Sequence, residues 1–445
     1  MENNKTLSYQ KLYNYNYNYQ FFGKLLAGGE KMMKNHKKNN ALNAKEKASF
    51  LRRKRLEQGK KLEEVAEGIC SVSYLSRIEK NQVEVNEDYY RALFEKLDLN
   101  YDDMNTNRKY DYLIDLLVKY LQGSYEEIHK FVVSMINDKY YLDIEIEMVL
   151  LLDNIIRGFY EDAKKGIVLI ELYENGLSNI EIIFYMFLIS LYGYKTNQIK
   201  KTLQQLEILE RMDIEEDVLK LCIKDIAIST YYRLGYINKA YIKYLSFKNN
   251  ASVHFFKRQI IIHQIETICY VNIENYHEKI DKLEEIKLGI DNNDIEIMES
   301  FIYHYSLIHY FNNEYQKAIN IATSKILSPR IVSIVAGGIL HQPNEYYQNE
   351  YLSIIKNYHF TKYDQIYEDF VNYVKLKISG CLPYKLWEEL KTNLTKSYFF
   401  DYFIYTFKIN ELVRLGITCS KSKETLRIVY NLLSSIENIC FKHLK

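Results

Sequence analysis

The 445-residue chain has only three prolines, at 329, 343 and 383, and 16 glycines. Proline and glycine interrupt helices more than other residues do, so their scarcity favours long helices throughout. Six cysteines occur singly, without a Cys-x-x-Cys pair or a metal-site spacing, which predicts free thiols in a reducing cytoplasm. We find no secretory signal, and the longest apolar run, 182–194, is too short to span a bilayer, which takes about 20 residues. We therefore expect a cytoplasmic protein.

The sequence also lacks the short motifs of common enzyme chemistry. It contains no phosphate-binding glycine loop, no His-Glu-x-x-His and no nucleophile elbow. Glu126-x-x-His129 matches a fragment of a di-iron site, but the required second copy is missing, so we interpret it as helix surface. His304 and His309 lie five residues apart, off a shared face, and are interpreted as core or groove residues. We predict no enzyme activity, no cofactor and no bound metal.

Positive charge is concentrated at the N-terminal end. The formal net charge is +1, but residues 1–61 hold 15 Lys and Arg against 4 Asp and Glu, which leaves the rest of the chain at −10. A basic front suits a polyanionic partner. A solvated tail explains part of this excess, but not the Arg-Arg-Lys-Arg run at 52–55, which lies inside a helical pattern.

The first forty residues are of low complexity, and their alternating Tyr and Asn offer no amphipathic face. Back-translation of Gly28–Lys31 gives a purine-rich run directly before Met32 and Met33, as in a bacterial ribosome-binding site that precedes a start codon. We therefore expect translation to start at Met32 or Met33. Residues 1–40 are interpreted as a disordered or misassigned extension.

Residues 41–104 contain four short helical patterns, over about 41–58, 62–66, 72–80 and 86–97. Gly59 and Gly68 close the first two, and Ser71 is placed to cap the third. A short helix, a tight turn and a second short helix are typical of a helix-turn-helix, whose second helix enters the major groove of DNA. The apolar positions expected inside are Phe50, Leu51, Leu56, Leu62, Val65, Ala66, Val72, Leu75, Ile78, Tyr90, Leu93, Phe94 and Leu97.

Polar side chains on the outer side of this module are predicted to contact DNA. Arginine is the best bidentate reader of guanine, so Arg77 is the leading candidate; its alternative is an ion pair with Glu79 or Glu84. Nearby cations would hold phosphates and set the salt dependence. The predicted DNA-binding residues are Arg52, Arg53, Lys60, Lys61, Ser71, Ser73, Tyr74, Arg77 and Lys80.

The stretch LRRKRLEQGKKLEEVAEGICSVSYLSRIEKNQ, residues 51–82, resembles the XRE-type helix-turn-helix of the Rgg/PlcR/PrgX group of bacterial peptide-pheromone regulators. Its core, 68–79, is similar to the PlcR-like version without gaps. Two positions depart from the group. Lys61-Leu62 stands where the group has a small capping residue and a phosphate-contacting Gln, which leaves that contact open. Asn81 replaces a Gly, and it too tolerates the left-handed conformation.

A repeated motif follows the polar linker at 105–108. An aromatic or aliphatic residue, two variable residues and a small residue recur at 123–128, 158–163, 196–202, 235–240, 274–279 and 313–318. Such regular spacing, of 35 to 39 residues, indicates stacked helix pairs. The motif resembles the turn and second-helix start of a tetratricopeptide repeat, although Ile128, Thr202 and Lys279 depart from the small-residue rule. We predict an all-α fold with a tetratricopeptide-like α-solenoid over 105–330; an irregular helical bundle is the alternative.

Residues 331–445 are predicted to form C-terminal helical repeats or a cap, because the period is lost after about 330. The tail 424–444 reads as one amphipathic helix. It would either cover the end of the solenoid or pair with a second subunit.

Concave faces of helical solenoids bind extended peptides through long polar side chains on their inner helices. Arg233 and Asn272 are the preferred candidates, because a polar residue in a buried groove needs a partner. The tyrosines also suit packing. The predicted peptide-binding residues are Tyr194, Asp225, Ser229, Tyr232, Arg233, Gln264, Asn272, Tyr303 and Tyr310.

The residues and the resemblance together predict a transcription regulator. It would read double-stranded DNA as a homodimer, and its array would sense a short signalling peptide, as in quorum sensing. One alternative binds a protein partner through the array. A second is a scaffold with a vestigial DNA module, against which the basic first helix argues.

Overall fold

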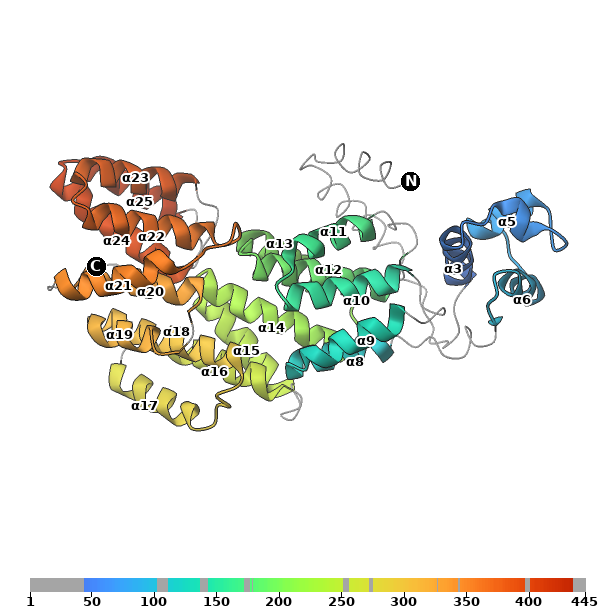
Figure 1. The fold of residues 1–445 in the computed structure, drawn as a ribbon, viewed down its shortest axis with the longest axis horizontal. Coiled ribbons are helices and arrows are strands. Elements are labelled where there is room, and N and C mark those ends of the chain that lie inside the picture. The colour runs from blue at the N-terminus through green and yellow to red at the C-terminus, as the bar shows by residue number, and fades with distance from the viewer. Residues whose placement is uncertain are drawn as a thin grey trace. The chain divides into compact units, whose positions relative to one another are not determined.

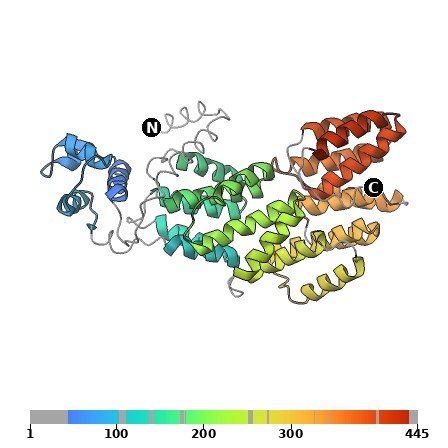
Figure 2. The same cartoon turned by 180° about the vertical axis from the view of Figure 1, so that it is seen from behind.

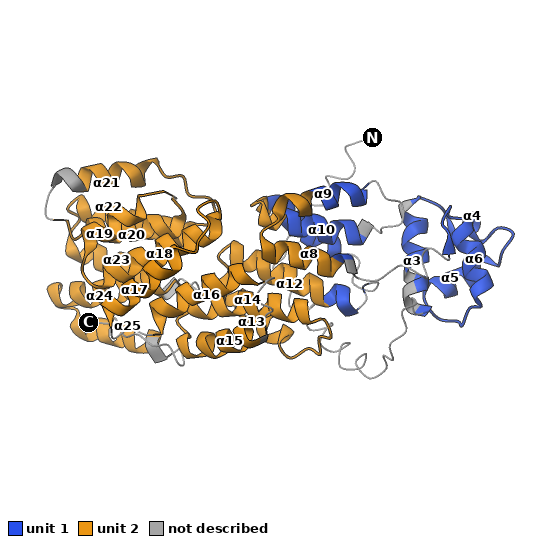
Figure 3. Ribbon diagram, turned by 90° about the horizontal axis from the view of Figure 1, so that it is seen from below, with its two compact units in different colours: residues 1–112, 130–153, 161–182 blue, residues 113–129, 154–160, 183–445 orange. Residues whose placement is uncertain are grey.

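The computed structural model describes residues 44–101, 111–136, 143–171, 177, 179–250, 256–271, 275–325, 327–342, 345–396 and 401–434. Within these ranges the regular secondary structure is α-helical and contains no strand, as predicted (Figure 1). The chain forms two compact units (Figure 3). The described residues of the first lie within 1–112, 130–153 and 161–182, and those of the second within 113–129, 154–160 and 183–445.

Four short helices begin the described chain: α3 (Ala44–Glu57), α4 (Leu62–Ala66), α5 (Val72–Glu79) and α6 (Glu87–Glu95). Their boundaries follow the predicted signals. The Ser71 hydroxyl accepts a hydrogen bond from the third backbone N–H of α5 at 3.2 Å. Gly59 and Gly68 adopt φ of 66° and 78°, which glycine reaches without strain. The rings of Phe50 and Phe94 stack in the core with centroids 5.5 Å apart.

Two apolar positions that we predicted to face this core are exposed instead. Leu56 is 57% exposed, because Arg55, one helical turn after the buried Leu51, takes the inward position at the end of α3. Val72 is 37% exposed; it is the first residue of α5, and a terminal helical residue has helical neighbours on one side only. Apolar pattern alone therefore misassigned the two helix ends.

The remaining helices follow one another in consecutive pairs. The pairs are α8 (Asp111–Gln122) with α9 (Tyr125–Ile136), α10 (Asp143–Ile156) with α11 (Tyr160–Glu171), α12 (Asn179–Lys195) with α13 (Ile199–Leu209), α14 (Asp217–Arg233) with α15 (Ile237–Asn250), α16 (Lys257–Tyr270) with α17 (Tyr276–Lys287), α18 (Ile295–Phe311) with α19 (Tyr315–Ala322), α20 (Pro329–Ile339) with α21 (Glu345–Asn357), α22 (Gln365–Ile378) with α23 (Pro383–Lys396) and α24 (Tyr402–Thr418) with α25 (Ser422–Ser434). Within the second unit, Figures 1 and 2 show successive helices side by side. No helix in the described ranges has the length and apolar character needed to cross a membrane.

The predicted repeat motifs, as far as they are described, lie at the turn and the start of the second helix of a pair. The residue two positions before that helix is commonly left-handed. Gly123, Gly158, Asn197, Gly235 and Asn313 have φ between 61° and 77°, a region open to Gly and tolerated by Asn. The predicted all-α, helical-repeat architecture is confirmed.

The last residue of the motif lies where the two helices of a pair approach. The alanines at this position are fully buried. Thr202 packs so tightly against α12 that a Cβ on Gly193 would lie 2.5 Å from its hydroxyl oxygen. Lys279 breaks the small-residue rule at little cost, because its buried Nζ donates to the carbonyl of Cys269 at 2.6 Å.

Helix pairs continue beyond 330, although the sequence period is lost there. A Cβ on Gly416 of α24 would lie 2.2 Å from the hydroxyl oxygen of Thr425 of α25, the same close approach as in α12 and α13. The preceding pair instead buries the bulky Trp387, whose indole N–H donates to Thr425 at 2.8 Å. Larger residues replace the small residue of the motif, so the motif cannot be recognised in the sequence although the helix pairs continue.

Candidate functional site

The helix α5 presents polar side chains outward, as its sequence predicted. Ser73 and Arg77 are exposed, and Tyr74 is half-buried with its ring edge-on to Tyr89, at 5.7 Å between centroids. Within the described residues no side chain accepts a hydrogen bond from Arg77 or pairs with it. Its guanidinium is therefore open to an external acceptor such as a base edge.

A buried ion pair fixes α5 against α3. Nε and Nη2 of Arg55 donate to the two carboxylate oxygens of Glu79 at 2.6 and 2.8 Å, and Nη1 donates to the carbonyl of Lys60 at 3.0 Å. Such a bidentate pair sets distance and orientation together. Glu79 is therefore occupied, and Arg77 pairs with neither it nor Glu84; the ion-pair alternative for Arg77 is not realised among the described residues.

The predicted phosphate-binding cations differ in exposure. Arg52, Lys61 and Lys80 are exposed. Lys60 is half-buried, and its ammonium donates to a backbone carbonyl at 2.9 Å. Arg53 is only 7% exposed, which contradicts its predicted surface position. Arg52 is the exposed member of residues 50–55, because α3 is buried around most of its circumference there.

The departure at Lys61 changes how α4 begins. A lysine side chain has no hydrogen-bond acceptor and cannot cap a helix. Instead, the Glu64 carboxylate accepts a hydrogen bond from the backbone N–H of Lys61 at 3.1 Å. Glu63, Glu64 and Glu67 are exposed, so α4 presents negative charge that repels phosphates. Contacts from this helix to the phosphate backbone of DNA would come from Lys61 alone.

Two exposed residues beside α5 were not singled out from the sequence. Gln82 follows Asn81, whose φ of 50° is the left-handed conformation that its type allowed. Tyr89 is 39% exposed against Tyr74. A glutamine can bond adenine in a bidentate manner, and the left-handed residue at the end of α5 is the sequence signal that could have drawn attention to it.

The predicted peptide-binding residues lie in the second unit, and most of them are buried. Ser229, Tyr232, Arg233, Tyr303 and Tyr310 are buried, Tyr194, Asp225 and Gln264 are half-buried, and Asn272 lies outside the described residues. The buried members contact other parts of the same unit. Their burial therefore rules out a fully open groove at these positions.

One group of these contacts surrounds His263. Its Nε2 lies 2.8 Å from Asp225 and its Nδ1 lies 2.9 Å from Glu266, which also accepts a hydrogen bond from Ser229 at 3.0 Å. Burial disfavours the charged imidazolium, but the two carboxylates outweigh burial and raise the pKa of His263 to about 9. This charged triad links α14 to α16.

A second group, here called the inner polar cluster, consists of Arg233, Tyr303, Arg330, Tyr367 and Asp401. Nη2 of Arg233 donates to the Tyr367 hydroxyl at 3.1 Å, and that hydroxyl donates to Asp401 at 3.3 Å. The guanidinium of Arg330 lies 3.9 Å from the centre of the Tyr303 ring. The cluster joins α14, α18, α20, α22 and the start of α24.

Three members of the inner polar cluster were missed by sequence reasoning. Arg330 is the last residue of the predicted array, and Tyr367 and Asp401 lie beyond it, where the repeat motif can no longer be recognised in the sequence. One signal was present for Arg330. It is the single charged residue of the apolar helix PRIVSIVAGGI, and an isolated cation in an apolar helix needs a buried partner or a ligand.

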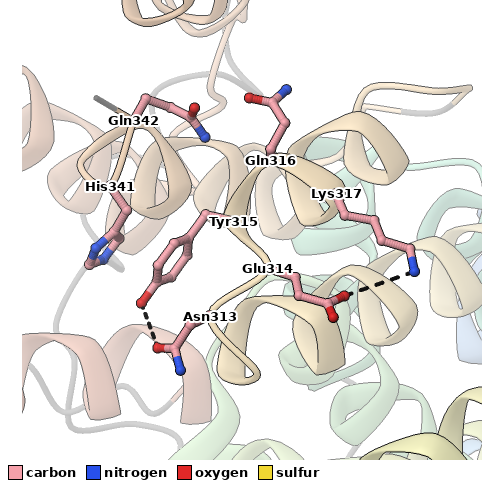
Figure 4. A pocket seen from close by; sticks show the side chains of 7 residues that line it. All are labelled: Asn313, Glu314, Tyr315, Gln316, Lys317, His341 and Gln342. Atoms are coloured by element: carbon pink, nitrogen blue, oxygen red, sulfur yellow. Dashed lines mark hydrogen bonds and ion pairs between the residues drawn. The ribbon is translucent and has the colours of Figure 1, made fainter. Parts of the chain in front are cut away.

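A shallow cavity of about 440 Å³ lies at the turn between α18 and α19, next to the end of α20 (Figure 4). It is lined by Asn313, Glu314, Tyr315, Gln316, Lys317, His341 and Gln342. The rings of Tyr315 and His341 stack with centroids 3.9 Å apart, and the Tyr315 hydroxyl donates to Asn313 at 2.8 Å. None of the predicted site residues lines it.

The described residues contain no group of three or more His, Cys, Asp or Glu that could hold a metal ion. Residues 51–104 match a protein-family model described as helix-turn-helix. No curated protein and no solved structure matches the chain. With α4 and α5 joined by a tight turn and a polar α5 facing outward, this match identifies residues 51–104 as an XRE-type helix-turn-helix domain, the DNA-binding module of transcription regulators.

Proposed function

We propose that the protein is a transcription regulator that reads DNA through α5 as a homodimer and senses a short signalling peptide through its helical repeats. The helix-turn-helix match supports the DNA-binding part. The single observation that carries base reading is Arg77, exposed on α5 and without a side-chain partner among the described residues. Arginine in this position bonds guanine in a bidentate manner, worth about 1–3 kcal/mol of discrimination.

Arg77→Ala tests this role. We expect binding to a labelled duplex that spans the gene's own promoter to weaken roughly 10- to 100-fold, since about 1–3 kcal/mol is lost. The far-UV circular dichroism should stay unchanged, because the removed side chain is exposed and forms no hydrogen bond or ion pair within the described residues. Arg211→Ala removes another exposed arginine, far along the chain, and should leave affinity unchanged. Equal binding by the two variants would overturn the assignment of α5.

The proposed homodimer is supported by apolar residues on the last helix pair. Ile417, Leu426 and Tyr430 are 67%, 62% and 72% exposed, and exposed large apolar side chains favour association with a partner. Two half-sites about 34 Å apart would then meet two copies of α5. Leu426→Ser with Tyr430→Ser should shift the sedimentation of the protein towards the monomer. Ile242→Ser, at 68% exposure on α15, is the control.

Peptide sensing is supported by the repeat architecture and by the polar side chains that its first helices direct inward. The alternative is a protein partner. Synthetic peptides from small secreted reading frames beside the gene, titrated against the full chain by calorimetry, separate the two. Saturable binding by one peptide supports peptide sensing. If none of the peptides from these reading frames binds while promoter binding is intact, a protein partner for the array is favoured.

A further inference from the structure

The walls of the cavity beside α18, α19 and α20 are held in place by contacts within the chain. A Cβ on Gly338 of α20 would lie 2.8 Å from the side chain of Ile319, so α20 packs directly against α19. Tyr315, at the start of α19, stacks on His341 and donates its hydroxyl to Asn313. Because these contacts form without a ligand, the cavity is preorganised, which lowers the cost of binding one.

Gln342 is a buried polar residue of this cavity whose side chain lacks a hydrogen-bond partner. The residue is 8% exposed, and its backbone is fixed, since its N–H donates to Ile339 at 3.0 Å and its carbonyl accepts from Gln348 at 2.7 Å. Across the described residues, its side-chain amide forms no hydrogen bond. Figure 4 shows this amide extending from the end of α20 towards the start of α19. An amide has both donors and an acceptor to satisfy, so Gln342 suits a ligand that offers the two together.

The first turn of α19 supplies further donors to the same cavity. The side chain of Glu314, which precedes this helix, does not cap it. Its carboxylate instead accepts hydrogen bonds from the Tyr276 hydroxyl and from Nδ1 of His309. The backbone N–H groups of 315–317 therefore have no acceptor among the described residues. The hydrogen bond from Tyr276 lowers the pKa of Glu314, and this negative charge at the helix start favours a neutral carbonyl over an anion.

We propose that this cavity binds an uncharged stretch of an extended peptide by its main chain. A peptide group offers an N–H to the oxygen of the Gln342 amide and a carbonyl to its nitrogen or to the first turn of α19. The exposed ring of His341, backed by Tyr315, offers a flat surface to a neighbouring apolar or aromatic side chain. The volume of about 440 Å³ lies within the range of about 300–1,000 Å³ typical of ligand sites. The inference rests on the proposed peptide sensing and deepens it by naming the site and the part of the peptide that it recognises.

The test is calorimetric titration of the full chain with two blocked peptides. One is acetyl-Ala-Ala-Phe-Ala-Ala-amide, and the other is its isomer in which sarcosine, which lacks the N–H, replaces each alanine. We expect the alanine peptide to bind saturably and the sarcosine isomer to bind about 3- to 10-fold more weakly, since a hydrogen bond is lost. Gln342→Leu should weaken the alanine peptide by about 5- to 50-fold, because up to two hydrogen bonds are lost. Its melting temperature should not fall, because the substitution removes a buried amide without a partner.

Two control variants should keep the affinity of the unmodified chain. Gln204→Leu makes the same substitution at an exposed position on α13. Lys317→Ala removes a charge from the lining of the same cavity, which an uncharged peptide does not need. His341→Ala, at an exposed position, removes the flat surface and should weaken binding even if Gln342→Leu fails to fold.

Several outcomes would overturn the proposal. They are equal affinity of the two isomers, unchanged affinity in Gln342→Leu, no binding by the unmodified chain, and displacement of the peptide by inorganic phosphate, which would identify an anion site. Peptides from the reading frames beside the gene separate this inference from the proposed function. If they bind Gln342→Leu as tightly as the unmodified chain, peptide sensing stands and this cavity is not its site. If they bind only the unmodified chain, both are supported.

Discussion

The helix-turn-helix domain and the helical-repeat unit place their charges differently. In the domain, Arg77 and Lys80 lie on the surface of α5, while one bidentate pair, Arg55 with Glu79, is buried. In the repeat unit, the His263 triad and the inner polar cluster lie between helices. A charged side chain on the surface has few possible partners within the chain, so it indicates an external partner. A buried charged side chain either stabilises the packing of helices or binds a ligand, and only its hydrogen bonds distinguish these two roles.

The largest expected effect concerns the buried pair of the domain. Glu79→Ala leaves the Arg55 charge buried without its partner, which costs about 3–5 kcal/mol of stability. Backbone amides of α3 and α5 should then exchange hydrogen much faster, as followed by mass spectrometry of the full chain, and promoter affinity should fall. The double variant Arg55→Met with Glu79→Leu should recover most of the protection. Glu84→Ala, at an exposed position, is the control, and equal exchange in both single variants would contradict the role of the pair.

Lys408 of α24 is a buried charge inside the repeat unit. Its replacement should stabilise the protein, whereas the loss of Glu79 should destabilise it. The side chain is 3% exposed, and burial lowers its pKa to about 8. Because the folded pKa lies below the ordinary value, the folded state is penalised below pH 8, and the penalty is relieved as pH rises from 8 towards 10.5. Lys408→Met should therefore stabilise the protein by up to about 3 kcal/mol at pH 7.

The measurement for Lys408 is the denaturation midpoint of the full chain as a function of pH. The gain from Lys408→Met should shrink between pH 8 and 10. Lys248→Met, at an exposed position on α15, should show neither gain nor pH dependence. A loss of stability at pH 7 in the Lys408 variant would mean that the ammonium has a favourable partner in the folded protein.

Much of the fold could be predicted because its signals are local. Ser71, Gly59 and Asn81 specify caps and left-handed turns through their own chemistry, and the structure confirms all three. The recurring motif likewise marked the start of second helices. Each of these features depends on residues within a few positions of one another, so a single sequence contains the full physical reason.

The errors and omissions have in common that they depend on distant residues. Arg53 and Arg55 belong to a basic run that predicts a surface position, but their burial is decided by helices that follow later in the chain. Arg330 and Asp401, 71 positions apart, meet only in the folded unit. Nothing in the local pattern states which helix will cover a given face. The predicted ligand-binding residues remain predictions for the same reason.

The His263 triad gives a pH signature specific to the repeat unit. Its folded pKa of about 9 lies above the ordinary value of about 6.5. The stabilisation is therefore complete below pH 6.5 and is lost as pH rises through 9, which amounts to about 3 kcal/mol in total. Imidazole titration followed by NMR should place the His263 midpoint near 9. A midpoint at or below 6.5 would show that the two carboxylates do not hold the charged form.

The smallest effect concerns the surface of the domain. Each phosphate contact that a cation makes contributes about 0.9 to the slope of log affinity against log salt concentration. Lys61→Ala should thus reduce the slope for promoter DNA by about one and weaken binding equally for all sequences, because a phosphate contact carries no base information. Arg77→Ala should instead weaken the promoter more than unrelated DNA. If Lys61→Ala leaves the slope unchanged, the acidic face of α4, formed by Glu63, Glu64 and Glu67, keeps that end of the domain away from the duplex, and the positive charge that steers it must come from Arg52 and Lys80.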